Sequence, residues 1–371
     1  MRLFKRKLRP WAAVLFASAF LVACGDDDDD PSSPDGFGEE SAQEMEEVAE
    51  ELVAPAEVSS EVQANLFNAY VSLLGLGGAP GVSPVAPFEL TARTRAPFRP
   101  APTLPSVAAA PMGALIPEEV EGTTFVWDTG DSMYVASDLT GAPANGVRFI
   151  WYEVNFDGIP VTPLTPLGHA DLMDESTAEV ARLEVLVVRD EGDETLADYF
   201  VQGEVDTTAT SATVTLRSEG FFSDGTTDLD FITQVVIFSS DTEERLETSV
   251  DLEGADGTIT LELEEAFSDA GASADGTFTI AGGGNEASFE FAGEGEEQVE
   301  SIEGSMSFNG EEVVVFSGEA DDPEFTQPDG SALTEELAEA LAGMWVAFGA
   351  TFLFAFEMLI PFYILMIFAG F

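Results

Sequence analysis

The chain has 371 residues and carries 70 aspartates and glutamates against 13 lysines and arginines, which gives a formal net charge of −57. So acidic a surface repels polyphosphates and anionic headgroups, because proteins bind both through cationic contacts, and we expect no nucleic-acid partner. A single cysteine and a single histidine exclude a disulfide framework and leave too few ligands for an ordinary zinc site.

The first 23 residues have the composition of an export signal. Five basic residues fall within the first nine, and an apolar run, residues 11–23, follows them. This run is too short to span a bilayer comfortably, and it ends in small residues. The signal leads into "LVAC", Leu21 to Cys24, which resembles the lipobox of bacterial lipoproteins.

The lipobox resemblance implies that residues 1–23 are removed and that Cys24 is acylated as the first residue of the mature chain. The protein is then expected to be lipid-anchored in the cell envelope through Cys24. Gly25 follows the cysteine in place of an aspartate, which by analogy with enterobacterial sorting favours the outer membrane over the inner. The alternative is an uncleaved N-terminal anchor with an incidental cysteine.

Removal of the signal makes the charge more extreme. The 13 basic residues fall to eight arginines while all 70 acidic residues remain, so the net charge becomes −62. No lysine is left, which excludes Ser–Lys dyads, Schiff-base lysines and phosphate-loop lysines. A lysine-free acidic surface resembles those of proteins from salt-loving organisms, so we expect a fold that is more stable at high salt. The alternative is that the acidic residues only keep the chain soluble.

The segment after the signal is predicted to be solvated. Residues 24–40 include "GDDDDDPSSPDGFGEE", a like-charged tract that repels itself and reads as an extended acidic tether. A calcium-binding role for its aspartates lacks the spaced ligands and the glycine turn of a calcium loop.

Residues 41–78 are predicted to form two short amphipathic helices. Each begins with a capping box and continues with apolar residues at helical spacing. The capping pairs are Ser41 with Glu44 and Ser60 with Gln63. Because each helix has one apolar stripe to bury, we favour helices that dock on the protein over free partner-binding helices.

Residues 79–118 are predicted to be a linker. They hold nine prolines, which block regular hydrogen bonding and favour extended and polyproline-like structure. Three of the eight mature arginines also lie here, namely Arg93, Arg95 and Arg99. We expect them to contact an acidic patch of this protein or an anionic envelope polymer.

Residues 119–322 alternate between apolar and polar side chains, which predicts a mainly β fold. In residues 246–267, Val250, Leu252, Ile259 and Leu261 face one way, while acidic residues and threonines face the other. Turn dipeptides recur at Asp224-Gly225, Asp256-Gly257, Gly283-Gly284 and Asn309-Gly310. We expect roughly ten to thirteen antiparallel strands in a large meander sheet or partly closed barrel.

Further strands are predicted from the same alternation at six places. They are residues 123–129, 146–154, 182–190, 228–238, 277–282 and 287–293. Each strand has one apolar face, so the sheet must cover that face by closing, by folding on itself or by accepting helices. Curved antiparallel sheets with helix covers resemble the architecture of periplasmic lipoprotein carriers, although no sequence motif supports this likeness.

Residues 329–371 are predicted to form a hydrophobic C-terminal helix, capped by Ser331. From residue 341 to the end only Glu357 is ionisable. Residues 341–360 are long enough to span a membrane. Alternatively, the helix bends at Pro361 and packs on the apolar face of the sheet, with Glu357 protonated or paired. A third interpretation is an outer-membrane strand that ends at Phe371.

The sequence offers little catalytic chemistry. His169 lies in a Pro-interrupted stretch that predicts a surface loop, and no G-x-S-x-G motif occurs. Trp127 and Trp151 are expected in the core rather than in a sugar or lipid site. The acidic clusters at residues 189–198 and 223–230 are expected to be solvated hairpin ends, with weak Ca²⁺ binding as the alternative.

We therefore expect a non-catalytic envelope protein without a cofactor or a metal site. Its apolar sheet face is expected to hold its own C-terminal helix or a lipid-like ligand. One alternative is a carboxylate-based hydrolase that acts on envelope glycans, because paired carboxylates suffice for that chemistry. The other is a structural envelope protein with a C-terminal membrane span.

Overall fold

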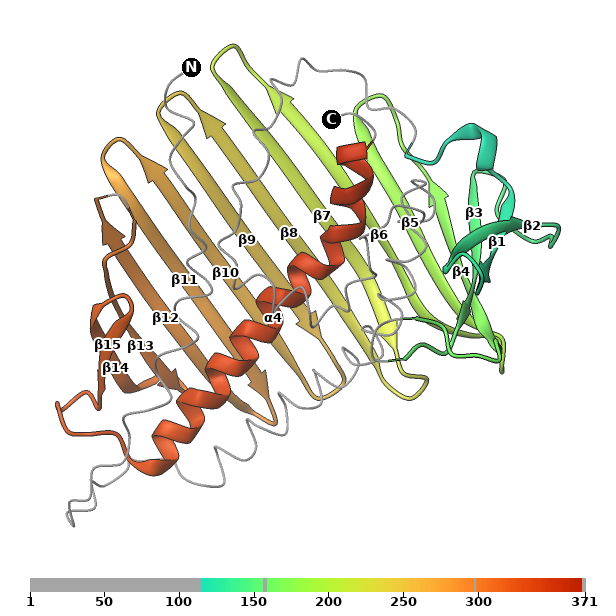
Figure 1. Ribbon diagram of the computed structural model, residues 1–371. Helices are drawn as coiled ribbons and strands as arrows, with labels where there is room; N and C mark the ends of the chain where they lie inside the picture. Colours follow the sequence, from blue (N-terminus) through green and yellow to red (C-terminus); the bar gives the residue numbers. More distant parts are fainter. Residues whose placement is uncertain (1–114, 156–158, 297, 369–371) are drawn as a thin grey trace.

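The computed structural model describes residues 115–155, 159–296 and 298–368 (Figure 1). Several predictions concern residues outside these ranges. They are the signal with Cys24, the acidic tether of residues 24–40, the two helices within residues 41–78, and the linker up to residue 114.

The described chain forms one open sheet of fifteen strands, ordered β15-β14-β13-β12-β11-β10-β9-β8-β7-β6-β5-β4-β3-β1-β2. Every neighbouring pair is antiparallel except β1 and β3, which are parallel. The strands are β1 (Thr123–Asp128), β2 (Met133–Ser137), β3 (Gly146–Tyr152), β4 (Pro166–Asp174), β5 (Val180–Arg189), β6 (Glu194–Thr207), β7 (Ser211–Ser223), β8 (Asp228–Ser240), β9 (Glu243–Glu253), β10 (Gly257–Ser268), β11 (Gly271–Gly282), β12 (Asn285–Gly295), β13 (Ser301–Phe308), β14 (Glu311–Glu319) and β15 (Asp322–Thr326).

The alternation predicted from the sequence is confirmed in β10. Ile259, Leu261 and Leu263 are between 0 and 8 % exposed, whereas Glu262 between them is exposed. We call the face that carries these three side chains the inner face of the sheet, and the opposite side the outer face. The mainly β meander and its hydrophobic C-terminal helix are thus as predicted, but the sheet has fifteen strands instead of ten to thirteen, and one strand pair is parallel.

Three of the four predicted turn dipeptides lie within turns. Asp224 and Gly225 lie between β7 and β8, and Gly225 has a φ angle of 89°. Gly283 and Gly284 join β11 to β12 with φ angles of 60° and 91°, and Asn309 and Gly310 join β13 to β14 with 49° and 78°. Positive φ at both central residues is the backbone of a type I′ hairpin, whose twist matches that of the strands.

Asp256 lies in the turn between β9 and β10, as predicted, but Gly257 already pairs with Gly282 as the first residue of β10. One local prediction is wrong. His169 does not lie in a loop but in β4, which begins at Pro166. A proline is compatible with the first position of a strand, where its missing N–H breaks no internal ladder bond.

Glycines on the inner face make room for aromatic rings on neighbouring strands. Gly276 of β11 pairs with Phe291 of β12, and Gly304 of β13 pairs with Phe316 of β14. A Cβ atom at either glycine would collide with the ring of its partner. The glycines therefore let large rings lie flat across the adjacent strand. Each ring covers the glycine, which has no side chain of its own to pack there.

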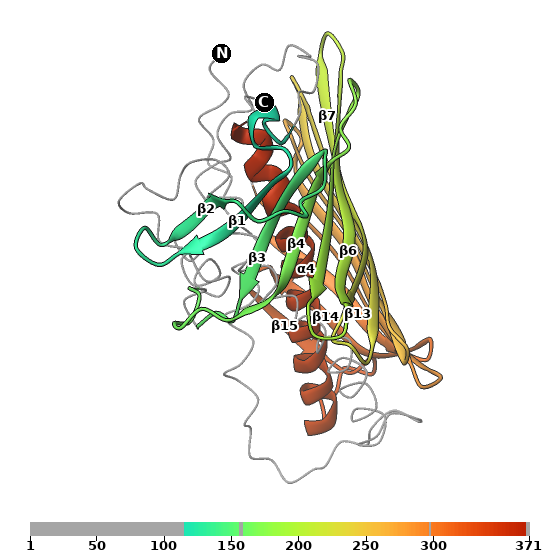
Figure 2. The ribbon, with the colours of Figure 1, turned by 90° about the vertical axis from the view of Figure 1, so that its right-hand side faces the viewer.

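The helix α4 (Glu335–Phe368) lies across the inner face of the sheet, at an angle to the strands (Figures 1 and 2). The backbone N–H of Leu337 donates to Oγ1 of Thr334 at 3.3 Å, so Thr334 caps the helix in place of the predicted Ser331. The helix continues through Pro361, although a proline removes one hydrogen bond of the helical ladder.

The start of the described chain is anchored in the same core. Leu115 and Ile116 are 5 and 0 % exposed, and the backbone N–H of Ile116 donates to Oδ2 of Asp174 in β4 at 2.9 Å. A short 3₁₀ helix, η3 (Glu118–Val120), then leads into β1.

Candidate hydrophobic binding face

The inner face of the sheet and the helix α4 share one apolar core. Among the α4 side chains that the structure describes, nine apolar ones are buried, all of them at 7 % exposure or less. They are Leu337, Leu341, Met344, Ala347, Phe348, Phe354, Ala355, Met358 and Leu359. Their spacing of three or four residues along most of the helix gives α4 one continuous face that contacts the sheet.

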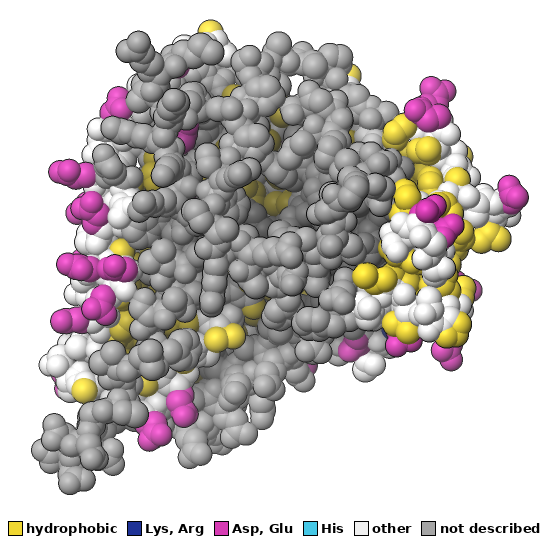
Figure 3. Space-filling view, in the orientation of Figure 1, with side chains coloured by type: hydrophobic (Ala, Val, Ile, Leu, Met, Phe, Trp, Pro, Cys, Tyr) yellow, Lys and Arg dark blue, Asp and Glu magenta, His cyan; other side chains and the backbone are white. Residues whose placement is uncertain are grey.

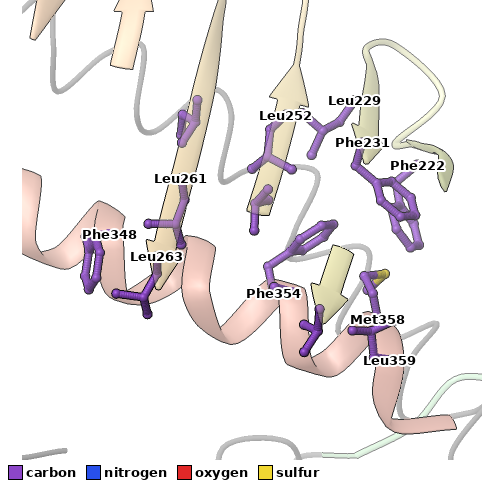
Figure 4. Close-up of a cluster of buried hydrophobic side chains, with 14 of the residues drawn as sticks. Phe222, Leu229, Phe231, Leu252, Leu261, Leu263, Phe348, Phe354, Met358 and Leu359 are labelled. Carbon is purple, nitrogen blue, oxygen red and sulfur yellow. The ribbon is translucent and has the colours of Figure 1, made fainter. Parts of the chain in front are cut away.

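Aromatic rings connect α4 to strands that are far apart in the sheet. Phe354 meets Phe231 of β8 edge to face, with 5.4 Å between ring centroids, and Phe348 meets Phe278 of β11 at 5.7 Å. Closer to the N-terminal end of α4, Trp345 meets Phe289 of β12, with 4.7 Å between ring centroids. Figure 4 shows Phe354 beside Phe231 and Phe222, and Phe348 beside Leu263. The helix thus crosses from β12 towards β7.

Two large apolar side chains in the described part of α4 point away from the sheet into solvent. Val346 is 64 % exposed and Leu353 is 44 % exposed. They lie seven residues apart and therefore on the same side of the helix, together with the exposed Gly343. This outward apolar stripe, defined by Gly343, Val346 and Leu353, distinguishes α4 from an ordinary cover helix, whose outer side is polar.

By length and composition alone, residues 337–355 of α4 would also suit a membrane span, and 44 % of the most apolar stretch is buried within the protein. This property is weak evidence for a span, since buried core helices share it. The contacts of α4 with the sheet provide a second environment in which the same residues are shielded from water.

The inner face carries few polar side chains. Among them, the hydroxyl groups of Tyr199, Thr233 and Thr248 are buried and have no hydrogen-bond partner within the described structure. Burial raises the pKa of the Tyr199 hydroxyl, so this group stays neutral. The face is therefore suited to apolar material and has almost no charge with which to orient a polar ligand.

The carboxyl groups on this face include that of Glu265 in β10 and that of Glu244 in β9, which pairs with Phe267. Glu265 of β10 has the same orientation as Ile259, Leu261 and Leu263, because the register of β10 continues to it without a bulge. Burial raises the pKa of Glu265, since an apolar environment disfavours the charged form. The predicted site residues do not include Glu265, although the alternation within residues 246–267 places it inward.

Each of the five arginines of the described chain is paired with a carboxylate, and four of them, all but Arg189 of β5, lie on the outer face. Arg148 binds Asp171 through two hydrogen bonds of 2.7 Å. The other pairs are Arg182 with Glu175, Arg189 with Glu194, Arg217 with Glu219, and Arg245 with Glu243 and Glu247. None of these five cations is left unpaired to face a ligand on the inner side.

The strands β11 to β15 form an open depression of about 700 Å³ whose acidic lining comes from the outer face. The acidic side chains at its surface are Asp275, Glu290, Glu303, Glu312 and Glu324. Acidic side chains also stand at the rim of the described surface in Figure 3. Within the described residues no group of three or more His, Cys, Asp or Glu side chains has the arrangement of a metal site.

The residues considered for catalysis are not brought together. His169 projects from β4 with its Nδ1 atom 3.5 Å from Oδ1 of Asp190, and its side chain is 18 % exposed. Trp127 and Trp151 are 6 and 3 % exposed, which confirms that they belong to the core. Cys24, the predicted lipidation site, lies outside the described residues.

The two acidic clusters considered for Ca²⁺ lie at hairpin ends. In the cluster at residues 223–230, Oδ1 of Asp224 accepts hydrogen bonds from the backbone N–H groups of Thr226 and Thr227. These bonds lower the pKa of Asp224. In the cluster at residues 189–198, Glu194 is paired with Arg189 at 2.7 Å. Both carboxylates therefore have partners from the chain itself.

Glu184 and Glu175 are neighbouring carboxyl groups on the outer face. Burial and the neighbouring Glu175, which is also hydrogen-bonded to it, raise the pKa of Glu184 on the outer face. Arg182 lies 3.4 Å from the other member, Glu175. The pair sits on β5 and the segment before it, at the opposite end of the sheet from the depression.

Comparison with family models, curated proteins and solved structures finds no match to this chain.

Proposed function

We propose that the protein is a lipid-anchored, non-catalytic cell-envelope protein whose inner sheet face holds apolar material. In this proposal α4 is the resident occupant of the face, and a lipid-like molecule is the ligand that lies against α4 or replaces part of it. The observation that carries the proposal is the aromatic contact of an apolar helix with β7, β8, β11 and β12.

The outward apolar stripe of α4 supports a ligand. Val346 and Leu353 are exposed to water. Burying them would stabilise the protein by about 25 cal/mol for each Å² of apolar surface removed from water. A sheet that needed only a cover would be served by a helix with a polar outer side. An acyl chain or another apolar molecule lying along Gly343, Val346 and Leu353 would remove this surface from water.

The proposed anchor places the sheet near a membrane. Acylated Cys24 would hold the chain at the envelope, and Gly25 after it favours the outer membrane by analogy with enterobacterial sorting. The negative charge of the mature chain opposes close contact with anionic headgroups. An extended acidic segment between Cys24 and the sheet is consistent with a domain held away from the lipid surface.

A second candidate function rests on the same stripe. A structural envelope protein could insert α4 into a membrane, and residues 337–355 are apolar enough to do so. Insertion would require α4 to give up its contacts with Phe231, Phe278 and Phe289. The two candidates therefore differ in whether α4 stays on the sheet.

The proposal is tested with two matched variants of the full-length chain, both carrying Cys24→Ser so that the protein is released from its anchor. Phe354→Ala with Met358→Ala loosens the sheet-facing side of α4, and Val346→Ala with Leu353→Ala alters only the outward stripe. We expect the first variant to bind a fluorescent apolar probe several-fold more strongly than the parent, and the second to bind it more weakly. Native mass spectrometry of the parent should show a co-purified lipid.

Two results would contradict the proposal. One is a parent protein that carries no lipid after mild purification and binds the probe no better than an unrelated acidic protein. The other is equal probe binding by both variants while circular dichroism shows an intact sheet. Complete partition of the Cys24→Ser parent into the membrane fraction would instead favour the inserted helix.

A further inference from the structure

Glu265 is isolated among apolar neighbours on the inner face. It pairs in register with Leu246 of β9 and Ala274 of β11, and Leu263 and Phe267 flank it on its own strand with the same orientation. Leu246, Ala274 and Phe267 are each only partly buried. The described structure therefore leaves this part of the inner face, around Glu265, incompletely covered.

No cation of the described chain faces Glu265. Its five arginines are all paired with other acids. Arg189, which shares the inward row of Val187, lies on β5, five strand spacings from β10. Among the described residues Glu265 makes no hydrogen bond and no ion pair, although burial makes its unpaired charge unfavourable. The mature chain has only three further cations, Arg93, Arg95 and Arg99.

We propose that residues 92–99, "ARTRAPFR", lie along the inner face beside α4 and that one of their arginines pairs with Glu265. The segment matches the surface in two respects. Its guanidinium groups complement the carboxylate of Glu265, and Phe98 and Pro97 complement the partly buried side chains around it. This contact is independent of what the inner face binds as a ligand.

The length of the chain permits the contact. Ile116 is fixed at Asp174 in β4, and six strand spacings separate β4 from β10 in the sheet. At about 4.8 Å for each spacing this is roughly 30 Å across the sheet. The residues between Arg99 and Leu115 reach about 50 Å when extended, and extension is what their prolines favour. The arginines can therefore reach β10 without strain.

The choice of Glu265 over the many other acids follows from desolvation. An ion pair with an exposed carboxylate gains little, because water and salt screen it. A partly buried carboxylate surrounded by apolar side chains gains more from a cation, and a guanidinium favours its charged form. Glu265 lies on the inner face, is partly buried among apolar side chains, and has no partner among the described residues.

The experiment is a disulfide test in the full-length Cys24→Ser chain, which has no other thiol. Cysteines are introduced at Ala96 and at Ala274, the partner of Glu265 in β11, so that Glu265 itself is kept. The control pairs Ala96→Cys with Glu262→Cys, which lies on the same strand as Glu265 but on the exposed outer face. Mild oxidation is followed by non-reducing electrophoresis and peptide mapping.

We expect an intramolecular disulfide between positions 96 and 274 that forms at least several-fold faster than the control. Adding Glu265→Gln, or neutralising the three arginines with Arg93→Gln, Arg95→Gln and Arg99→Gln, should slow it several-fold. Equal rates for the two cysteine pairs would overturn the docking of the segment. A disulfide that forms at the same rate with Glu265→Gln would overturn the ion pair. Neither readout depends on a lipid, so the proposed function can fail separately.

Discussion

Phe354 of α4 and Phe231 of β8 meet edge to face, with ring centroids 5.4 Å apart and an angle of 85° between their planes. Phe231 in turn stacks on Phe222 of β7 at 5.3 Å. Such ring pairs contribute about 0.5–1.5 kcal/mol each beyond the burial of their area. The C-terminal helix is therefore part of the core of the sheet, and its removal from the sheet would expose three large rings.

Replacement of Phe354 by alanine should be strongly destabilising. Phe354 is 6 % exposed, and loss of a buried phenylalanine side chain costs about 3–5 kcal/mol. Leu353→Ala is the matched control, because the neighbouring side chain is 44 % exposed and its loss should cost under about 1 kcal/mol. Urea unfolding followed by circular dichroism measures both. Equal losses would mean that α4 is not held on the sheet through this side.

Two glycine-to-alanine changes should have opposite effects. Gly304→Ala places a Cβ against the backbone oxygen of Glu290 and the ring of Phe316, which should cost about 1–3 kcal/mol through overpacking. Gly343→Ala in α4 meets no atom within 4 Å and should stabilise by about 0.5–1 kcal/mol, because alanine is the better helix former. The thermal midpoints of the two variants test this. A destabilised Gly343→Ala would show that something packs against Gly343.

The stability of the protein should depend on pH through Glu184. Its pKa in the folded protein is raised above the ordinary value of 4.5 by burial and by Glu175. A raised folded pKa means that the contribution of Glu184 to stability is fully present below pH 4.5 and is lost as the pH rises through the folded pKa. Glu184→Gln should therefore be more stable than the parent at pH 7 and not at pH 4.

The control for this titration is Glu262→Gln, which removes one exposed negative charge elsewhere on the outer face. Free energies of unfolding of all three proteins are compared between pH 4 and pH 7. If the free energies of unfolding of Glu184→Gln and Glu262→Gln follow the same pH curve, the effect is that of net charge alone. The hydrogen bond between Glu184 and Glu175 then has no role in stability.

Salt should stabilise the fold. The mature chain is expected to carry a net charge of −62, and the range of charge repulsion falls from about 10 Å at 0.1 M salt to about 3 Å at 1 M. We expect a higher Tm in 2 M than in 0.1 M NaCl, with most of the gain reached before 1 M. Equal values of Tm at the two concentrations would contradict the prediction, and a purely linear rise would point to salting-out in place of screening.

The strands that were predicted correctly have a strong period-two pattern of large apolar residues. In β10 the inward positions hold Ile259, Leu261 and Leu263, and the outward positions hold threonine and glutamate. β4 was missed because its inward positions hold the small residues Gly168 and Ala170. Small residues give a weak apolar-polar alternation in the sequence. The space above them is filled by large side chains of neighbouring strands, as where Trp151 of β3 lies over Gly168.

The tail was predicted as a hydrophobic helix, but its environment was not. An apolar helix has the same hydropathy whether lipid or a sheet surrounds it, so the sequence left three alternatives open. The distinction depends on rings from distant strands, such as Phe278 and Phe289, which meet Phe348 and Trp345 only after the sheet has formed. Glu265 was overlooked for a related reason, since one inward acid stands out only against its cross-strand neighbours.

The central claim is that α4 rests on the inner face with one side buried and the other exposed, and two single-cysteine variants test it most directly. Val346→Cys and Ala347→Cys, each in the Cys24→Ser background, replace adjacent residues that are 64 and 4 % exposed. Maleimide labelling of the folded protein without detergent should modify position 346 rapidly and position 347 only at the rate of unfolding. Similar rates at both positions, fast or slow, would contradict the arrangement of helix and sheet described above.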